Sequence, residues 1–139
     1  MSDAQTRITE APSIVEILQQ TLPDLEFVYL FGSRARGEAR TESDLDIAYM
    51  ARTRLDRVAR FRLQERIATS VGRDVDLVDL AVASTVLRVQ IIDGGRVLFA
   101  RDETARQRFE MTALSAYARL NEERRGILED IRRRGTVHG

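Results

Sequence analysis

Short apolar runs alternate along the chain with segments of helical periodicity, and Gly, Pro and Asp residues separate them. The apolar runs predict strands at 25–31, 45–50, 74–80 and 96–100. The periodic segments predict helices at 12–22, 54–71, 83–92 and 102–134. This order indicates an α+β fold, with a small mixed sheet of about four strands, flanking helices and a long C-terminal helix.

Residue choice supports the predicted helix limits. Pro12 suits the first turn of a helix, and Gly72 suits a C-terminal cap. The apolar positions of helix 54–71 near helical spacing are Leu55, Val58, Phe61 (or Arg62), Ile67 and Val71. The last helix is either one long helix or two helices with a kink near Gly126. Its apolar stripe comprises Phe109, Ala113, Ala116, Leu120, Ile127 and Ile131. We expect this stripe to pack mainly on the core, and its length leaves room for a partner interface.

The 139 residues suit a single domain, with a core at about 12–100 and a helical extension at about 101–139. No apolar run approaches the roughly 20 residues that cross a bilayer. The first ten residues are polar and do not resemble a signal peptide. We therefore expect a cytoplasmic protein without a membrane segment.

Composition excludes several kinds of chemistry. The chain has no Cys, all 22 of its basic residues are Arg, and His138 is its only His. Thiol catalysis, cysteine–zinc sites, Schiff bases and the lysine-dependent P-loop are thereby excluded. Carboxylates, hydroxyls, Arg and backbone amides remain, and carboxylates favour hard cations such as Mg²⁺ or Mn²⁺. The net charge of zero argues against direct nucleic-acid binding as the main role.

The strongest chemical signal follows the first predicted strand. Gly32-Ser33 ends that strand, and ten residues separate Ser33 from the pair Asp44-x-Asp46. On a strand, Asp44 and Asp46 project from the same face, about 7 Å apart. A divalent cation would relieve the repulsion between the two carboxylates. Gly32 permits a tight turn, and backbone amides after it attract phosphate. One short segment is thus suited to bind both a metal and a triphosphate.

Other charged residues near this segment allow more than one interpretation. Arg36, and less readily Arg34, suit phosphate binding, although both are also placed to pair with Glu38 or Glu42. Asp74 fits the entry to the third strand. Asp79 is expected to face solvent or to end that strand. Tyr29 and Tyr49 flank the segment and are expected in the core. The run Arg132–Arg134 is typical of a solvated helix end.

The stretch from Leu30 to Met50 resembles the DNA polymerase β-type nucleotidyltransferase superfamily, whose signature is Gly-Ser, a loop of about this length and Asp-x-Asp. Arg36-Gly37 and Ser43 match as well, most closely the minimal nucleotidyltransferases, or MNT domains. Val75-Asp76-Leu77-Val78 fits the family's third carboxylate, which points to Asp76 rather than Asp74. The resemblance covers about residues 12–100, and no family motif maps onto 101–139.

The resemblance implies a function as well as a fold. It implies that Asp44, Asp46 and Asp76 are catalytic metal ligands for Mg²⁺ or Mn²⁺, and that Gly32 and Ser33, with Arg36, bind the triphosphate of ATP. About 39 residues follow the last strand, which we expect to be too few for an acceptor-binding domain, so another chain should complete the site.

Such domains resemble antitoxins that move AMP from ATP onto a tyrosine of a helical HEPN ribonuclease toxin, in a hetero-oligomer. Two alternatives stay open: a non-catalytic binding antitoxin, which the intact carboxylate set disfavours, and a small-molecule or antibiotic nucleotidyltransferase, which the missing second domain disfavours.

Overall fold

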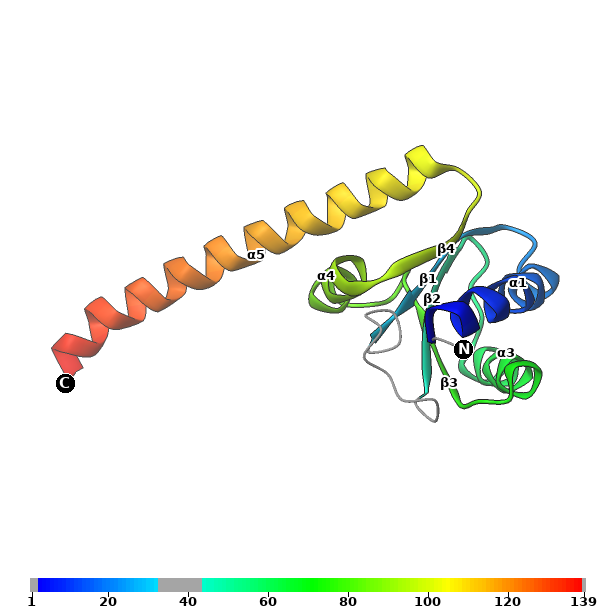
Figure 1. The fold of residues 1–139 in the computed structure, drawn as a ribbon. Coiled ribbons are helices and arrows are strands. Elements are labelled where there is room, and N and C mark those ends of the chain that lie inside the picture. The colour runs from blue at the N-terminus through cyan, green and yellow to red at the C-terminus, as the bar shows by residue number, and fades with distance from the viewer. Residues whose placement is uncertain (1–2, 33–43, 139) are drawn as a thin grey trace.

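A computed structural model describes residues 3–32 and 44–138 and has the predicted α+β architecture (Figure 1). The helices are α1 (Asp3–Thr21), α3 (Arg57–Val71), α4 (Thr85–Gly94) and α5 (Glu103–His138). The strands are β1 (Leu25–Phe31), β2 (Leu45–Ala51), β3 (Val75–Asp79) and β4 (Arg96–Ala100). Within the described parts, no helix is long and apolar enough to cross a membrane.

The strands form one mixed sheet in the order β3-β2-β1-β4. β1 is antiparallel to both β2 and β4, and β2 is parallel to β3. The parallel pair requires a crossover, which α3 supplies. Helices α1 and α3 cover one face, where Ile14, Leu18 and Ile67 are buried. Helix α4 and the first turns of α5 cover the other face, where Phe109 packs beside Ile91. The sheet therefore lies between two helical layers.

Local signals explain most element limits and two of the errors in the predicted limits. α3 begins later than expected, because Asp56 is its N-cap and accepts a hydrogen bond from the Ala59 backbone N–H at 2.7 Å. Gly72 caps its end at φ 71°, as predicted. α1 begins at Asp3 rather than at Pro12, because no Gly or Pro in residues 3–11 interrupts it. Pro12 thus lies inside the helix and removes one backbone hydrogen bond.

The predicted apolar face of α3 was partly wrong. Leu63 and Ile67 are its buried residues, whereas Val58 and Phe61 are both more than half exposed. Positions 63, 67 and 71 recur at spacings of four and share a face. Val58 and Phe61 lie on the opposite side of the helix, which the sheet does not reach.

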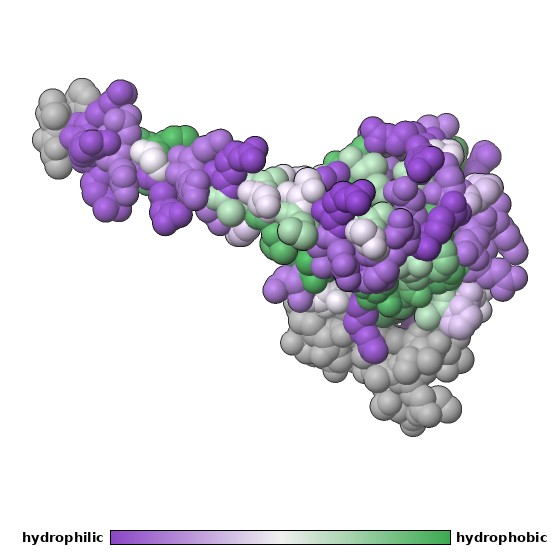
Figure 2. Space-filling view, turned by 90° about the horizontal axis from the view of Figure 1, so that it is seen from above, coloured by the Kyte–Doolittle hydropathy of each residue, from purple (hydrophilic) through white to green (hydrophobic). Residues whose placement is uncertain are grey.

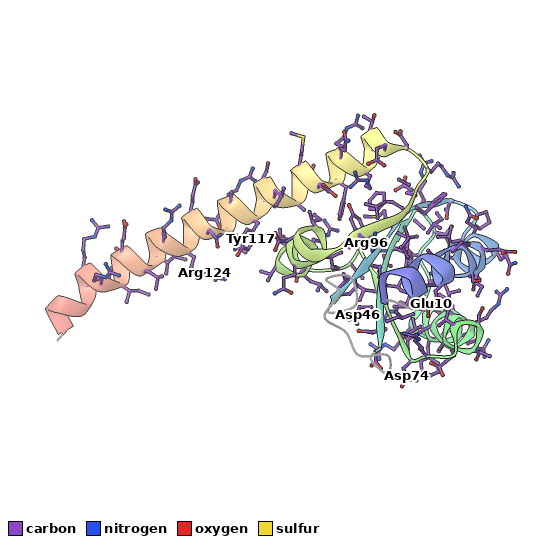
Figure 3. The ribbon with its side chains drawn as sticks, viewed as in Figure 1. Glu10, Asp46, Asp74, Arg96, Tyr117 and Arg124 are labelled. Atoms are coloured by element: carbon purple, nitrogen blue, oxygen red, sulfur yellow. The ribbon has the colours of Figure 1, made fainter. Side chains whose placement is uncertain are left out.

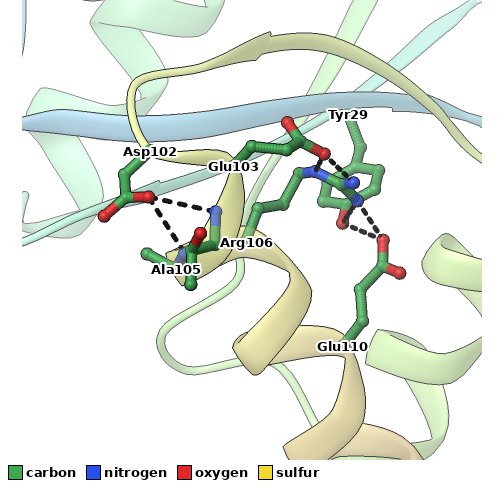
Figure 4. A network of polar contacts seen from close by, with 7 residues as sticks. Tyr29, Asp102, Glu103, Ala105, Arg106 and Glu110 are labelled. Atoms are coloured by element: carbon green, nitrogen blue, oxygen red, sulfur yellow. Dashed lines mark hydrogen bonds and ion pairs between the residues drawn. The ribbon is translucent and has the colours of Figure 1, made fainter.

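Helix α5 is one continuous helix and passes through Gly126 without a break. A polar cluster attaches its first turns to β1 (Figure 4). The Tyr29 hydroxyl donates to the Glu110 carboxylate at 2.5 Å and accepts from the Arg106 guanidinium at 3.2 Å. Arg106 also pairs with Glu103 and Glu110. The cluster fixes the direction in which α5 leaves the sheet.

The expectation that the stripe of α5 packs mainly on the core holds only for its first part. Phe109, near the start of α5, packs on the core, and Ala113 is buried. Ile127 and Ile131 are 60% and 56% exposed. The helix has run past the edge of the domain at these positions, so no other described element covers them (Figure 1).

Candidate active site

Register in the sheet brings two of the predicted carboxylates together. Asp46 lies directly across from Asp76 in the parallel pairing of β2 with β3. It also lies opposite Phe31 at the end of β1, one residue before Gly32. Asp44 immediately precedes β2 and is exposed, as is Asp76. Three strand ends thus place Asp44, Asp46, Asp76 and Gly32 at one end of the sheet, where Figure 3 shows Asp46.

The charges of Asp44 and Asp76 both act on Asp46. Its pKa is raised above the ordinary value of 3.8, first by partial burial, then by the charge of Asp76 and then by that of Asp44. All three causes disfavour the charged form of Asp46. The strand ends therefore concentrate negative charge at a half-buried position, which a cation could neutralise.

Gly32 contacts the same carboxylate. Its φ of 76° lies in the left-handed region that favours glycine. A Cβ added at Gly32 would overlap the Oδ2 atom of Asp46 and lie 3.2 Å from its Cγ. Glycine at this position is therefore required twice, for the turn after β1 and for the space that the Asp46 side chain occupies.

The two other acidic residues near β3, Asp74 and Asp79, lie in different environments. Asp74 is exposed just before the strand, and its backbone carbonyl accepts from the Leu45 N–H at 2.9 Å. It is not among the charges that raise the pKa of Asp46. Asp79 ends β3 as expected but is only 5% exposed. Its carboxylate accepts from the Ala81 N–H at 2.9 Å, so it holds the turn after β3.

Tyr29 and Tyr49 both lie in the core, as predicted. Burial, followed by the charge of Asp79, raises the pKa of Tyr49 to about 12. Burial, followed by the bond to Glu110, likewise raises the pKa of Tyr29. Both hydroxyls therefore stay protonated at neutral pH and act as structural groups.

A cavity of about 730 Å³ opens beside Gly32. Its lining includes Phe31 and Leu87 as apolar residues, and Gln90, Asp93 and Arg96 as polar ones. The sequence analysis did not single out the polar residues of this lining, because Gln90 and Asp93 lie in α4 and Arg96 begins β4, without a motif that marks a ligand site. The cavity is of the size that small-molecule ligands occupy. Gly32, which contacts the Asp46 carboxylate, is part of its lining.

Ser33, Arg34 and Arg36 lie outside the described residues. Across residues 3–32 and 44–138, no group of three or more acidic, His or Cys side chains is arranged to hold a metal ion. Asp44, Asp46 and Asp76 therefore lie near one another without forming such a group in the described part of the chain.

Comparison with known proteins identifies the family. The family described as Polymerase beta, Nucleotidyltransferase matches residues 13–104. The chain belongs to this nucleotidyltransferase family. The matched residues include Gly32 and the three carboxylates, Asp44, Asp46 and Asp76.

Within this family, the chain is similar to antitoxins of HEPN/MNT pairs. Protein adenylyltransferase MntA of Shewanella oneidensis is 38% identical over 85% of this chain and 84% of its own length. A crystal structure of a toxin–antitoxin with AMP-PNP has 37% identity and a TM-score of 0.79, covering 87% of this chain and 97% of its own. A tri-AMPylated S. oneidensis HEPN toxin in complex with MNT antitoxin contains a chain with 35% identity and a TM-score of 0.74, which covers 88% of this chain and 96% of its own. The nucleotidyltransferase is thus an MntA-like member of the family.

Proposed function

We propose that this nucleotidyltransferase transfers AMP from ATP to a tyrosine hydroxyl of a helical HEPN-type toxin and thereby neutralises the toxin. The observation that carries the proposal is the pairing of Asp46 with Asp76, beside Asp44 and Gly32. A chain that only occluded its partner would have no physical need for this arrangement. Its relatives include a protein adenylyltransferase and the antitoxin of an AMPylated toxin.

The three carboxylates suit a divalent cation. Asp44, Asp46 and Asp76 would supply the oxygen ligands that Mg²⁺ or Mn²⁺ prefers. The cation would compensate the charge that now raises the pKa of Asp46. When bound, such a metal supplies Lewis-acid stabilisation of the triphosphate and of the attacking oxygen.

The nucleotide would lie along Gly32 and the adjoining cavity. The absence of a Cβ at Gly32 lets phosphate approach the backbone. By family resemblance, Ser33 and Arg36, outside the described residues, bind the triphosphate. The cavity beyond Gly32, with Gln90 and Arg96 in its lining, provides room for the rest of ATP.

The transfer itself is an in-line displacement. The tyrosine oxygen of the toxin attacks the α-phosphorus of ATP, and the bond from that phosphorus to the bridging oxygen breaks. Pyrophosphate leaves, and the phenolic proton passes to a base. Asp76 is exposed beside Asp46 and is the group that we assign to accept this proton. Because ATP is the donor, we place the reaction in the cytoplasm.

The test mixes the chain with a HEPN-type partner protein, ATP and Mg²⁺, and weighs the HEPN protein by intact mass spectrometry. We expect mass gains in steps of one AMP, lost with Asp44→Asn and Asp46→Asn. Asp74→Asn is the matched control, because Asp74 is an exposed carboxylate at the same end of the sheet, and it should retain transfer.

Two results would contradict this function. A HEPN protein that is fully inhibited but unmodified would show that the chain acts by binding alone. Full transfer by Asp46→Asn would show that the carboxylate cluster is not the catalytic site.

A further inference from the structure

The turn between α4 and β4 lies at the same end of the sheet as Gly32. Arg96, the first residue of β4, pairs in register with Leu30 of β1, two residues before Gly32. Gly95 sets how closely α4 and β4 approach this strand, because a Cβ there would overlap the backbone oxygen of Ile91 and lie 3.3 Å from that of Leu30. The backbone position of Arg96 beside the turn after β1 is therefore fixed by close packing.

The residues of α4 that line the cavity change in character along the helix. Leu87, Gln90 and Asp93 recur at spacings of three, so they share one side of α4 and span about 9 Å along its axis. α4 runs toward the end of the sheet at which β4 begins, so the lining passes from apolar Leu87 through the Gln90 amide to the charges of Asp93 and Arg96. A nucleotide has the same order, from an apolar base through the ribose hydroxyls to anionic phosphates.

Two charges in the lining of the cavity, those of Asp93 and Arg96, are unpaired among the described residues. Hydrophilic surface covers most of the described part of the molecule (Figure 2), so exposed charge alone marks no site. Asp93, however, lies in the last turn of α4, where the negative end of the helix dipole disfavours a carboxylate. Arg96 follows three residues later and does not pair with it. A charge that opposes helix stability and lines a cavity indicates a role in binding.

We propose that Asp93 selects ribonucleotides by accepting hydrogen bonds from the ribose hydroxyls of ATP, while Arg96 binds its phosphates. This inference rests on the proposed function for the identity of the nucleotide. An ionised carboxylate only accepts hydrogen bonds, which suits the 2′ and 3′ hydroxyls and repels phosphate. A guanidinium only donates, and its planar donors match phosphate oxygens. The two charges therefore orient the nucleotide with its phosphates toward Gly32 and its base toward Leu87.

The contact between Asp93 and the ribose has a measurable consequence. A nucleotide without ribose hydroxyls loses charge-assisted hydrogen bonds and leaves the carboxylate without a partner. Loss of one such bond changes an affinity about tenfold or more. The preference for ATP over 2′,3′-dideoxy-ATP therefore reports on this contact, because the two nucleotides share the base and the triphosphate.

The test measures the binding of ATP and of 2′,3′-dideoxy-ATP by calorimetry, with Mg²⁺ and without a partner protein. The wild-type chain is compared with Asp93→Ala and Arg96→Gln. Asp74→Ala is the matched control, because Asp74 is an exposed carboxylate at the same end of the sheet and lies outside the cavity lining. A thermal melt of each variant without nucleotide reports on folding.

The wild-type chain should bind ATP at least about tenfold more tightly than dideoxy-ATP. Asp93→Ala should bind both nucleotides equally and without loss of Tm, since a carboxylate is unfavourable at that end of a helix. Arg96→Gln should weaken the binding of both nucleotides by a similar factor and keep the preference for ATP. Asp74→Ala should match the wild type.

Three results would overturn the inference. Equal binding of the two nucleotides by the wild-type chain, or a full preference for ATP in Asp93→Ala, would contradict the ribose contact. Unchanged affinity for ATP in Arg96→Gln would contradict the phosphate contact.

Failure of the proposed function gives a different result. A wild-type chain that binds ATP with the expected preference but transfers no AMP to a HEPN-type protein contradicts the transferase activity and still supports the ribose contact. A chain that transfers the nucleotide equally well from ATP and from dideoxy-ATP supports the transferase activity and overturns the ribose contact.

Discussion

Gly32→Ala tests whether the missing side chain at position 32 makes room for a catalytic carboxylate. The substitution adds one methyl group at a residue whose φ is 76° and whose missing Cβ leaves room for the Asp46 carboxylate. Two effects follow from the structure. The left-handed backbone becomes strained, and the added Cβ displaces the Asp46 side chain.

The two effects act on different quantities. The strain of a non-glycine residue in the left-handed region costs about 1–2 kcal/mol, which lowers Tm by roughly 3–8 °C in a domain of this size. The overlap with Asp46 adds little to this, because Oδ2 is at the end of a side chain that can rotate away. Transfer suffers more, since a misplacement of about 1 Å at a reacting centre costs roughly a hundredfold in rate.

Gly72→Ala separates these effects. Gly72 has a φ of 71°, but a Cβ there would meet nothing within 4 Å. Both variants should therefore lose similar stability in thermal melts, while only Gly32→Ala should lose AMP transfer to the HEPN protein. Equal activity of the two variants would refute the argument that Gly32 makes room for a catalytic carboxylate.

Three further changes have defined outcomes. The pKa of Asp46 is raised in the folded state above its ordinary value of 3.8. The free energy of unfolding of the metal-free protein, measured in urea, should therefore fall as pH rises from about 4 through the raised pKa. Asp46→Asn should abolish this fall. Tyr29→Phe removes the bond to Glu110 and should cost about 1–3 kcal/mol in urea unfolding, with faster hydrogen exchange in the first turns of α5. Gly126→Ala, in the open helix interior, should stabilise the C-terminal half of α5 locally by about 1 kcal/mol, seen as slower hydrogen exchange around residue 126.

The sequence by itself determined the strands and the chemistry. Each strand is a short apolar run with a local break beside it, so Leu25–Phe31 and Arg96–Ala100 were predicted with their observed limits. The spacing of Gly32, Asp44 and Asp46 is also a local property of the chain. This spacing predicted the family, because the family's motif lies within one strand, the turn after it and the next strand of the chain.

Tertiary structure decided which residues meet. Asp46 lies beside Asp76 because β2 and β3 pair in parallel with this register, and residues 30 positions apart have no local reason to be neighbours. Asp79 is buried, and its carboxylate accepts a hydrogen bond from the Ala81 N–H in the turn after β3.

The apolar periodicity of a helix likewise does not say what lies opposite each turn. Ala113 and Ile131 occupy the same face of α5, yet one is buried and the other exposed, because the domain beneath the helix ends between them. Burial depends on the extent of the surface opposite a helix, which only the assembled fold determines.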